Sequence, residues 1–251
     1  FGLLGPNGAG KTTTISLLST LLLPTKGEIL IDGQQLTRQR PDLKRKISMI
    51  TQEYSMRQDM NMDEIMEYQG RLYFMPRKQI KERTEELLEF CDLLKFRKRT
   101  VRKLSGGMKR KLMVCRALLT DPEILLLDEP TAGMDALSRR QMWNLLRKLN
   151  EKNLTILLTT HYMEEAQSLC NRVALMDHGK LEEVSTPQAL IESLGAYAVD
   201  EMTADGTQNH YFHTRQEAIR YLEELTGQAS LRETTLEDVF VERAGKHLIS
   251  K

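Results

Sequence analysis

The chain has 251 residues, 40% of them hydrophobic, which is enough to fill the core of one large domain or of a domain with an appendage. Lys and Arg total 36 against 35 Asp and Glu, so the net charge of +1 gives no whole-chain argument for binding nucleic acid or an anionic surface. The longest apolar stretch, residues 17–23, contains Ser19 and Thr20 and is shorter than the ~20 residues that a membrane-spanning helix needs. We therefore predict a globular protein that does not itself cross a membrane.

The first motif lies close to the start of the chain. Residues 5–13 read Gly-Pro-Asn-Gly-Ala-Gly-Lys-Thr-Thr, after the apolar run of residues 1–4 and before a helical pattern. A Gly-rich turn between a strand and a helix lets backbone N–H groups close around a phosphate at the positive end of the helix dipole. Lys11 would then reach the β- and γ-phosphates of a nucleotide, and the Thr12 hydroxyl would ligate Mg²⁺. The alternative, an ordinary glycine turn, is disfavoured by the motifs that follow.

No signal peptide is visible, and the sequence starts at Phe1 rather than Met, already within the strand that leads into this motif. We expect that a segment upstream of Phe1 is missing. Three cysteines, Cys91, Cys115 and Cys170, are widely spaced and lack a metal-binding spacing. We interpret them as packed core thiols of a protein from a reducing compartment.

Short apolar runs rich in β-formers recur along the chain at residues 1–4, 47–50, 124–127, 155–158 and 173–176. Helical patterns separate most of them, which predicts an α/β fold with a mostly parallel sheet. Residues 26–32 read as one further exposed strand, whose hairpin partners we expect upstream of Phe1, so that it forms a partial antiparallel element.

Between residues 55 and 120 the strand patterns stop and helix formers take over, which predicts a helical subdomain inserted into the α/β core. A short helix is expected from Pro187 to about Leu194, and Gly195 marks a change to polar sequence. We therefore place the main domain at residues 1–194 and a small C-terminal α/β extension, of regulatory or dimerisation type, at residues 195–251. Helices are predicted there at residues 216–225 and 236–244, the latter capped by Thr235 and Asp238.

Two carboxylates follow the apolar run of residues 124–127. The carboxyl end of a buried strand is where open α/β sheets bind ligands, and Asp128 and Glu129 stand there. Asp128 would hold Mg²⁺, and Glu129 would orient and deprotonate an attacking water. The alternative is that both carboxylates only cap the following turn.

Three further sites carry less information taken singly. Ser105, Gly106 and Gly107 precede a basic helical stretch, where they could be a plain helix cap or a second phosphate cradle. His161 follows the strand at residues 155–158 and could reach a γ-phosphate, although a lone His is more often structural. Gln52 follows the strand at residues 47–50 and could touch the metal or the water with its amide oxygen.

A cluster of basic residues and a cluster of methionines each have a structural and a functional interpretation. The basic run of residues 95–103 is either a solvated face or a contact for anionic lipid or an acidic partner loop. Four methionines, Met56, Met60, Met62 and Met66, either fill the core or form an adaptable groove for a helix of a membrane subunit.

In this order, the motifs resemble the ATP-binding subunit of ABC transporters. The phosphate loop, Gln52, Leu104-Ser105-Gly106-Gly107, Asp128-Glu129, Ala132-Gly133-Met134-Asp135 and His161 carry the resemblance. It covers Phe1 to about Leu194, and residues 234–245 look like the C-terminal tail of exporter ATPases similar to the daunorubicin-resistance type. Residues Leu104-Ser105-Gly106-Gly107 correspond to the signature motif of the family, which Gln more usually follows. Here Met108 follows it, as in many exporter-type members. The aromatic residue that stacks on adenine in the family would lie upstream of Phe1.

The resemblance implies a phosphate-loop NTPase core with ATP and Mg²⁺ as cofactors. Thr12, Gln52 and Asp128 would serve the metal, Glu129 would be the general base, His161 would hold the γ-phosphate, and Gln52 would join them. Ser105, Gly106 and Gly107 would contact the ATP bound to the opposite subunit, with Asp135 at the dimer seam. The triphosphate would be bound by Asn7, Gly8, Ala9, Gly10, Lys11, Thr12 and Thr13.

We predict an ATP-hydrolysing subunit that powers export through a separate polytopic membrane permease. It would act as a homodimer or pseudo-symmetric dimer on the cytoplasmic face of the cell membrane, with no nucleic acid partner. The alternative is a soluble ABC ATPase that acts in DNA repair or on ribosomes, although such relatives usually carry two cassettes or a long coiled-coil insertion. A regulatory module without turnover is disfavoured by Glu129 and His161, and a phosphate-loop kinase would have no need for residues 104–108.

Overall fold

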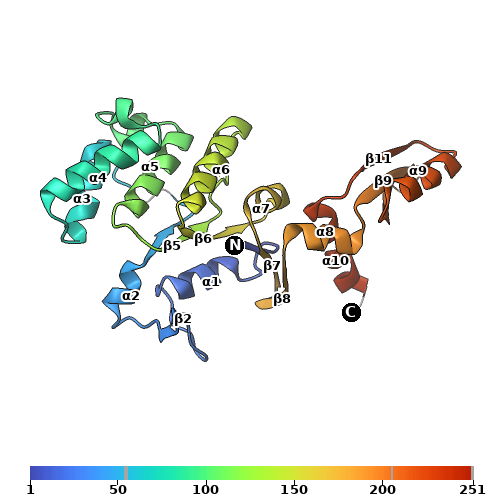
Figure 1. Cartoon of the computed structure of the whole chain (residues 1–251), viewed down its shortest axis with the longest axis horizontal. Helices are drawn as coiled ribbons and strands as arrows, with labels where there is room; N and C mark the ends of the chain where they lie inside the picture. Colours follow the sequence, from blue (N-terminus) through green and yellow to red (C-terminus); the bar gives the residue numbers. More distant parts are fainter. Residues whose placement is uncertain (54–55, 205, 250–251) are drawn as a thin grey trace. The chain divides into compact units, whose positions relative to one another are not determined.

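A computed structural model describes residues 1–53, 56–204 and 206–249. The chain forms two compact units, and Figure 1 labels the helices and strands of both. The large unit comprises Gly5–His161 and Met176–Lys180, and the second unit comprises Phe1–Leu4, Tyr162–Leu175 and Leu181–Lys251. The predicted boundary after residue 194 stays a prediction.

The large unit is built on three parallel strands in the order β4-β5-β6. Their bounds are β4 (Ile47–Ile50), β5 (Ile124–Asp128) and β6 (Thr155–Thr160). Leu125, Leu126 and Leu127 are all buried, because helices cover both faces of a parallel sheet. Helix α1 (Lys11–Leu18) packs on β5 and α2 (Pro41–Arg45) packs on β4, while α6 (Ala136–Glu151) connects β5 to β6.

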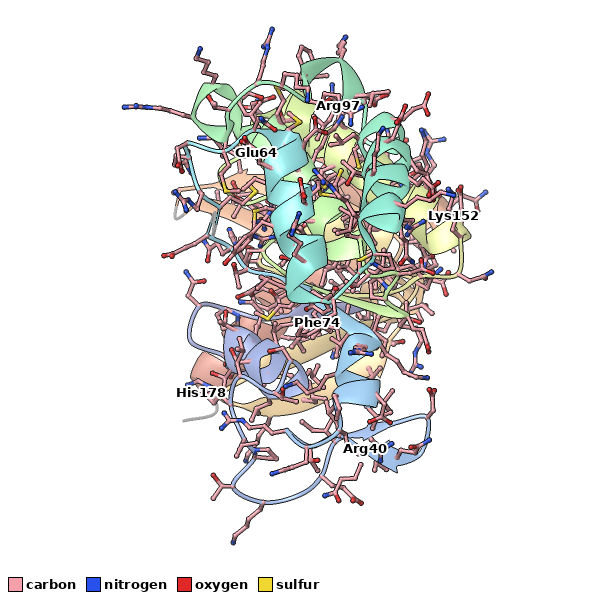
Figure 2. All side chains as sticks on the ribbon, turned by 90° about the vertical axis from the view of Figure 1, so that its left-hand side faces the viewer. Arg40, Glu64, Phe74, Arg97, Lys152 and His178 are labelled. Carbon is pink, nitrogen blue, oxygen red and sulfur yellow. The ribbon has the colours of Figure 1, made fainter. Side chains whose placement is uncertain are left out.

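The insertion between β4 and β5 is helical, as predicted. It contains α3 (Met62–Leu72), α4 (Arg77–Phe90) and α5 (Gly106–Leu118), with short 3₁₀ turns at Leu94–Phe96 and Val101–Lys103. Asn61 and Glu64 form a reciprocal capping box that starts α3. Gly70 lets α3 approach α4 closely, because a Cβ there would lie 2.5 Å from Ile80 Cγ1. Figure 2 looks onto α3, with Glu64 near its start and Phe74 beyond its end.

Two methionines and two basic residues of the clusters left open by the sequence have contacts within this insertion. Met62 and Met66 are fully buried, so they fill the core. Within the basic run, Arg97 and Lys98 each lie 2.9 Å from the Asp63 carboxylate at the start of α3. Burial of Asp63 raises its pKa, but hydrogen bonds from Arg97 and Lys98 outweigh this and lower it overall.

The antiparallel element differs from its prediction. Strand β2 (Leu30–Ile31) pairs with β3 (Gln34–Gln35), which lies downstream of it, and the expected partners upstream of Phe1 are not needed for this pairing. Asp32 and Gly33 connect the two strands, both with positive φ, of 50° and 73°. This is the conformation of a two-residue hairpin turn, which an Asp-Gly pair favours.

The second unit contains a parallel pair and an antiparallel sheet. Strand β1 (Gly2–Leu4) pairs in parallel with β7 (Val173–Asp177), and β8 (Lys180–Ser185) follows in the order β1-β7-β8. The helices α7 (Met163–Leu169), α8 (Pro187–Leu194) and α10 (Leu236–Ile249) pack against one another. Thr235 and Asp238 form the expected cap of α10, with the Thr235 N–H donating to Asp238 Oδ2 at 2.7 Å.

The C-terminal extension adds a small ββαβ arrangement to the second unit. Strand β9 (Tyr197–Thr203) lies between β10 (Gly206–Phe212) and β11 (Ala229–Glu233), and α9 (Arg215–Glu224) packs against the sheet. All pairings in this sheet are antiparallel. The sequence predicted its helices and its α/β class but not its strands, because they are polar.

Two further findings concern the cysteines and the apolar content of the helices. Cys91, Cys115 and Cys170 are buried, and burial raises the pKa of the Cys170 thiol to about 11. Among the described residues, no helix has both the length and the apolar content that a bilayer crossing demands. The predicted fold class, an α/β core with a mostly parallel sheet, a helical insertion, an antiparallel element and a small C-terminal extension, is confirmed.

Candidate active site

The phosphate loop connects β1 to α1, and its glycines have distinct structural reasons. Gly8 and Gly10 have φ of 82° and 106°, in the left-handed region that side chains other than glycine rarely adopt. At Gly5 a Cβ would lie 2.2 Å from the Met176 carbonyl oxygen, so only glycine fits against that backbone. Helix α1 begins at Lys11, which directs its first backbone N–H groups toward the loop.

Lys11 is the buried cation of the loop. Its Nζ donates to the carbonyl oxygens of Gly5 at 2.8 Å and Pro6 at 3.1 Å, and it lies 4.0 Å from Glu129 Oε1. The side chain is only 7% exposed. A buried ammonium is costly unless it is paired, so the loop holds a positive charge poised for an anion such as a phosphate.

Several side-chain oxygens that could bind a metal ion lie at the C-terminal end of β5. The Thr12 hydroxyl donates to Asp128 Oδ1 at 3.2 Å, and the Thr159 hydroxyl donates to the same oxygen at 2.6 Å. Both hydroxyls hold the Asp128 carboxylate in one orientation, with Thr12 coming from α1 and Thr159 from β6. Carboxylate, hydroxyl and amide oxygens are the ligands that Mg²⁺ prefers, so Thr12, Asp128 and the nearby Gln52 fit this metal.

Glu129 is held in a strained backbone conformation beside these oxygens. Its φ is 50°, which is uncommon for a residue other than glycine, and its N–H donates to Thr159 Oγ1 at 3.1 Å. The carboxylate Oε2 lies 2.8 Å from His161 Nδ1. The strained turn after β5 therefore places the Glu129 carboxylate between the Lys11 ammonium and the His161 ring.

One cavity of about 310 Å³ collects most of the predicted site. The structure brings Gln52, Glu129 and His161 to the phosphate loop from three different strand ends. Ala9 is buried, and its carbonyl accepts from the Gly179 N–H at 2.8 Å, while Asp128 accepts from the Thr12 hydroxyl. The residues that line the cavity are Asn7, Gly8, Gly10, Lys11, Thr12, Thr13, Gln52, Glu129 and His161.

The signature residues lie elsewhere in the large unit. Ser105 caps α5, with its Oγ accepting from the Met108 N–H at 3.3 Å, and Gly106 is the first residue of that helix. Ser105 and Gly107 line a different cavity, of about 460 Å³, between α5 and α6. These residues therefore do not join the phosphate loop of their own chain.

Asp135 closes the start of α6 beside the signature. Its carboxylate accepts from the Ser138 N–H at 2.9 Å and from the Ser138 hydroxyl at 2.7 Å. The backbone and side-chain hydrogen bonds from Ser138 lower the pKa of Asp135. A Cβ on Gly107 would lie 3.1 Å from Ser138 Oγ, so the starts of α5 and α6 are close together.

Arg110 is a residue that the sequence analysis missed. It lies on α5, is 4% exposed, and donates to the carbonyl oxygens of Thr51, Glu129 and Pro130 at 2.7, 2.9 and 2.8 Å. The guanidinium thus ties the signature helix to the loop of Gln52 and to the turn of Glu129. Its only sequence signal is its place in the basic stretch of residues 109–111, where nothing distinguishes it from its neighbours.

The family model described as "ABC transporter" matches residues 1–132, slightly more than half of the chain. The chain belongs to the ABC transporter family. The Nod factor export ATP-binding protein I of Cupriavidus metallidurans is 36% identical to it, over 99% of this chain and 89% of the relative. The linearmycin resistance ATP-binding protein of Bacillus subtilis is 36% identical over 82% of this chain and 66% of the relative. A daunorubicin resistance ATP-binding protein of Streptomyces coeruleorubidus is 37% identical over the same shares, 82% and 66%.

Solved structures of the family have the same fold. The ATP-binding subunit of an ABC transporter superimposes with a TM-score of 0.66 at 26% identity, over 76% of this chain and 80% of the other. A dimeric ATP-binding cassette in a post-hydrolysis state, bound to ADP and phosphate, gives 0.64 at 27% identity, over 74% and 84%. The resemblance of the motifs is thus confirmed: this chain is an ATP-binding subunit of the exporter type and an ATPase.

Proposed function

We propose that the cavity beside the phosphate loop binds MgATP and hydrolyses it, and that hydrolysis drives export through a separate membrane subunit. One observation carries this proposal. The Glu129 carboxylate lies 2.8 Å from His161 Nδ1 and 4.0 Å from Lys11 Nζ, in the cavity that the phosphate loop lines. A base, its positioning partner and a phosphate-binding cation thus share one site.

The oxygen donors of the site would hold Mg²⁺. Thr12 and Asp128 supply a hydroxyl and a carboxylate that already contact one another at 3.2 Å, and the Gln52 amide lines the same cavity. When bound, Mg²⁺ neutralises charge on the phosphate oxygens as the bond to the γ-phosphorus breaks. Thr159 would support this role by holding Asp128 in place.

The protein's own residues would divide the hydrolysis between them. The backbone N–H groups of the loop and the Lys11 ammonium bind the phosphate oxygens and stabilise the charge that develops on them. Glu129 accepts a proton from the attacking water, whose oxygen bonds to the γ-phosphorus while the bond to ADP breaks. His161 keeps the Glu129 carboxylate directed into the cavity and reaches the γ-phosphate.

The active unit would be a dimer with two shared sites. Ser105, Gly106 and Gly107 lie at the N-terminus of α5, and Ser105 and Gly107 line a cavity other than the one beside the phosphate loop of their own chain, so this helix end would bind the γ-phosphate held by a second copy. The solved relative that is dimeric and bound to ADP and phosphate supports this arrangement. Asp135, which caps the neighbouring helix α6, would lie at the seam.

This chain would lie on the cytoplasmic side of the membrane subunit and contact it with the C-terminal end of α3. Tyr68, Leu72, Tyr73 and Phe74 are exposed there, and Phe74 is 89% exposed (Figure 2). A cluster of exposed large apolar side chains in a helical insertion is typical of a protein-binding surface. The names of the relatives, which refer to Nod factor export and to linearmycin and daunorubicin resistance, support an export role.

The variant Glu129→Gln tests the hydrolytic assignment. Loss of the base should reduce ATP turnover by a factor of about 100 to 10,000 while ATP binding remains, because the amide keeps the size of the side chain but cannot accept the proton. Glu123→Gln is the matched control, since Glu123 lies just before β5 and is exposed. Normal turnover of the Glu129 variant, with the control equal to the wild type, would remove Glu129 from its role.

Co-purification tests the membrane partner. Tagged Glu129→Gln protein, extracted from its native membranes in MgATP, should bring down a polytopic membrane protein that mass spectrometry identifies. Phe74→Ser should reduce the recovered partner, whereas Leu181→Ser, at an exposed leucine in the second unit, should not. Recovery of ribosomal or DNA-repair proteins in place of a membrane protein would contradict the export role and leave the ATPase assignment intact.

A further inference from the structure

Strand β10 (Gly206–Phe212) is an edge strand of the antiparallel sheet in the second unit. The sheet has the order β10-β9-β11, so among the described residues β10 has a strand neighbour on one side only. Its seven residues, Gly-Thr-Gln-Asn-His-Tyr-Phe, include no Lys, Arg, Asp, Glu or Pro. The register with β9 runs from Gly206 opposite Thr203 to Phe212 opposite Tyr197 without a bulge.

Natural edge strands usually carry a feature that prevents pairing with another strand. Lysine, proline, a bulge or a short length serves this purpose, and β10 has none of them. The other edge is different, because β11 carries Arg232 and Glu233 and Arg232 is ion-paired with Asp200 at 2.7 Å. Alternate residues of β10 direct their backbone N–H and C=O groups away from β9, where a further strand can pair with them.

The sheet also has little core of its own. Ala198, Val199 and Ala218 are its fully buried apolar residues, and two of them are alanines. Tyr221 of α9 adds a ring contact to Phe212, with centroids 5.2 Å apart. A three-stranded sheet with one helix gains stability when further strands extend it. The uncharged edge at β10 is the place where such an extension fits.

We propose that β10 pairs antiparallel with β10 of a second copy of this chain, joining two three-stranded sheets into one sheet of six strands. A two-fold axis generates this arrangement, in which the same strand meets itself in the opposite direction. Pairing all seven residues centres the register on Asn209, opposite its own copy, and sets Thr207 opposite Tyr211. No charged side chain of the strand then faces a like charge.

The occupant is a second copy because the strand is complementary to itself and because the proposed shared ATP sites already bring two copies together. Contact at β10 goes beyond that ATP-bound dimer, since backbone pairing needs no nucleotide. A contact that persists without nucleotide raises the effective concentration of one ATP-binding subunit for another.

A matched pair of lysine variants tests the proposal. Asn209 and Ser230 both lie opposite Asp200 of β9, one on each edge of the sheet. The full-length wild type, freed of nucleotide and Mg²⁺, should be a dimer by sedimentation velocity. Asn209→Lys should weaken this dimer about tenfold or more, because two like charges meet at the axis, while Ser230→Lys should leave it unchanged.

Cross-linking provides a second measurement that does not depend on weakening the dimer. Directly opposite residues of antiparallel strands lie close enough for a disulfide, so Asn209→Cys should form a covalent dimer on mild oxidation and Ser230→Cys should not. The natural cysteines are buried and give a low background. A monomeric nucleotide-free wild type, equal effects of the two lysine variants, or equal cross-linking at the two edges would each overturn the proposal. Because all of these measurements omit ATP, their failure is distinct from a failure of the ATPase assignment.

Discussion

One charged cluster in each unit shows a different arrangement. In the large unit, the Lys11 ammonium and the Glu129 carboxylate lie 4.0 Å apart and both line a cavity. In the second unit, Arg232 donates to Asp238 and Asp200 at 2.7 Å each, and Thr235 supplies further donors to Asp238. The first arrangement leaves room for a ligand between its charges, whereas the second pairs its charges directly.

This difference separates a binding site from a structural ion pair. A buried charge that lines a cavity can be reached by a ligand of opposite charge, so it supports binding and catalysis. A charge with several short hydrogen bonds is already satisfied and supports the fold.

Lys11→Ala removes the cation of the open site and should have the largest effect on function. Loss of charge-assisted hydrogen bonds to the phosphates should weaken ATP binding by about 100-fold or more. Isothermal titration with ATP measures this, with the exposed Lys26→Ala as control. Unchanged affinity would show that the phosphate loop is not the nucleotide site.

Arg110→Met tests the buried cation that connects helix α5 to the loop of Gln52 and the turn of Glu129. Its guanidinium satisfies carbonyl oxygens from the loop of Gln52 and the turn of Glu129, so its loss leaves them unpaired in the interior. We expect the large unit to lose about 3 kcal/mol of stability, measured by urea unfolding. Arg102→Met, at an exposed arginine nearby, should cost less than about 0.5 kcal/mol, and equal losses would contradict the role of Arg110.

Asp238→Asn tests the closed ion pair of the second unit. Burial raises the pKa of Asp238, but hydrogen bonds from Arg232 and Thr235 outweigh it and lower the pKa overall. A carboxyl whose pKa is lower in the folded state stabilises above its unfolded pKa of about 4, and this stabilisation is lost as the pH falls through the folded pKa. The variant should therefore cost about 1–2 kcal/mol at neutral pH, and much less in acid.

Thermal unfolding at neutral and at acidic pH measures this difference for Asp238→Asn. The exposed Arg40–Asp42 pair provides the comparison, since hydrogen bonding to Arg40 lowers the pKa of Asp42 to about 2 in full contact with solvent. We expect Asp42→Asn to shift the melting temperature less than Asp238→Asn does. A larger shift for Asp42→Asn would mean that the closed pair of the second unit is not a structural contact.

The smallest expected effect concerns backbone strain, which occurs both in the candidate active site and at the end of helix α3. Glu129 and Phe74 have φ of 50° and 57°. Phe74 follows the last turn of α3, where the Met75 N–H donates to the Gly70 carbonyl in the pattern of a helix that ends in a left-handed residue. Phe74→Gly should stabilise the large unit by about 0.5–1 kcal/mol in urea unfolding, since glycine relieves the strain. A destabilised variant would show that the exposed ring packs on the protein.

Local patterns explain why so much of the site could be predicted from the sequence. The phosphate loop needs its glycines at fixed positions, and Asp128 and Glu129 follow a strand whose apolar run is unmistakable. Parallel strands bring their carboxyl ends to one edge, so Gln52, Glu129 and His161 were predicted to meet there. The structure places all three in the lining of one cavity, and the roles predicted for them stay predictions.

Other features depended on contacts between distant segments. Arg110 stands between two lysines of the same charge, and only the approach of α5 to the ends of β4 and β5 distinguishes it. The pairing of β2 with β3 follows from a two-residue turn, which the longer predicted strand at residues 26–32 concealed. Strands β9, β10 and β11 are polar and only partly buried, so their alternation was too weak to predict a sheet.

The sequence by itself determined the family, the ATPase motifs and the α/β class with its helical insertion. These features depend on residue types at fixed local spacing. The geometry of the backbone in loops, helices and strands requires that spacing. The tertiary structure decided which charges face a cavity and which are closed, where Arg110 binds, and that β10 is an unprotected edge. Each of these depends on which segments become neighbours, because burial and pairing are properties of the folded surface and not of local sequence.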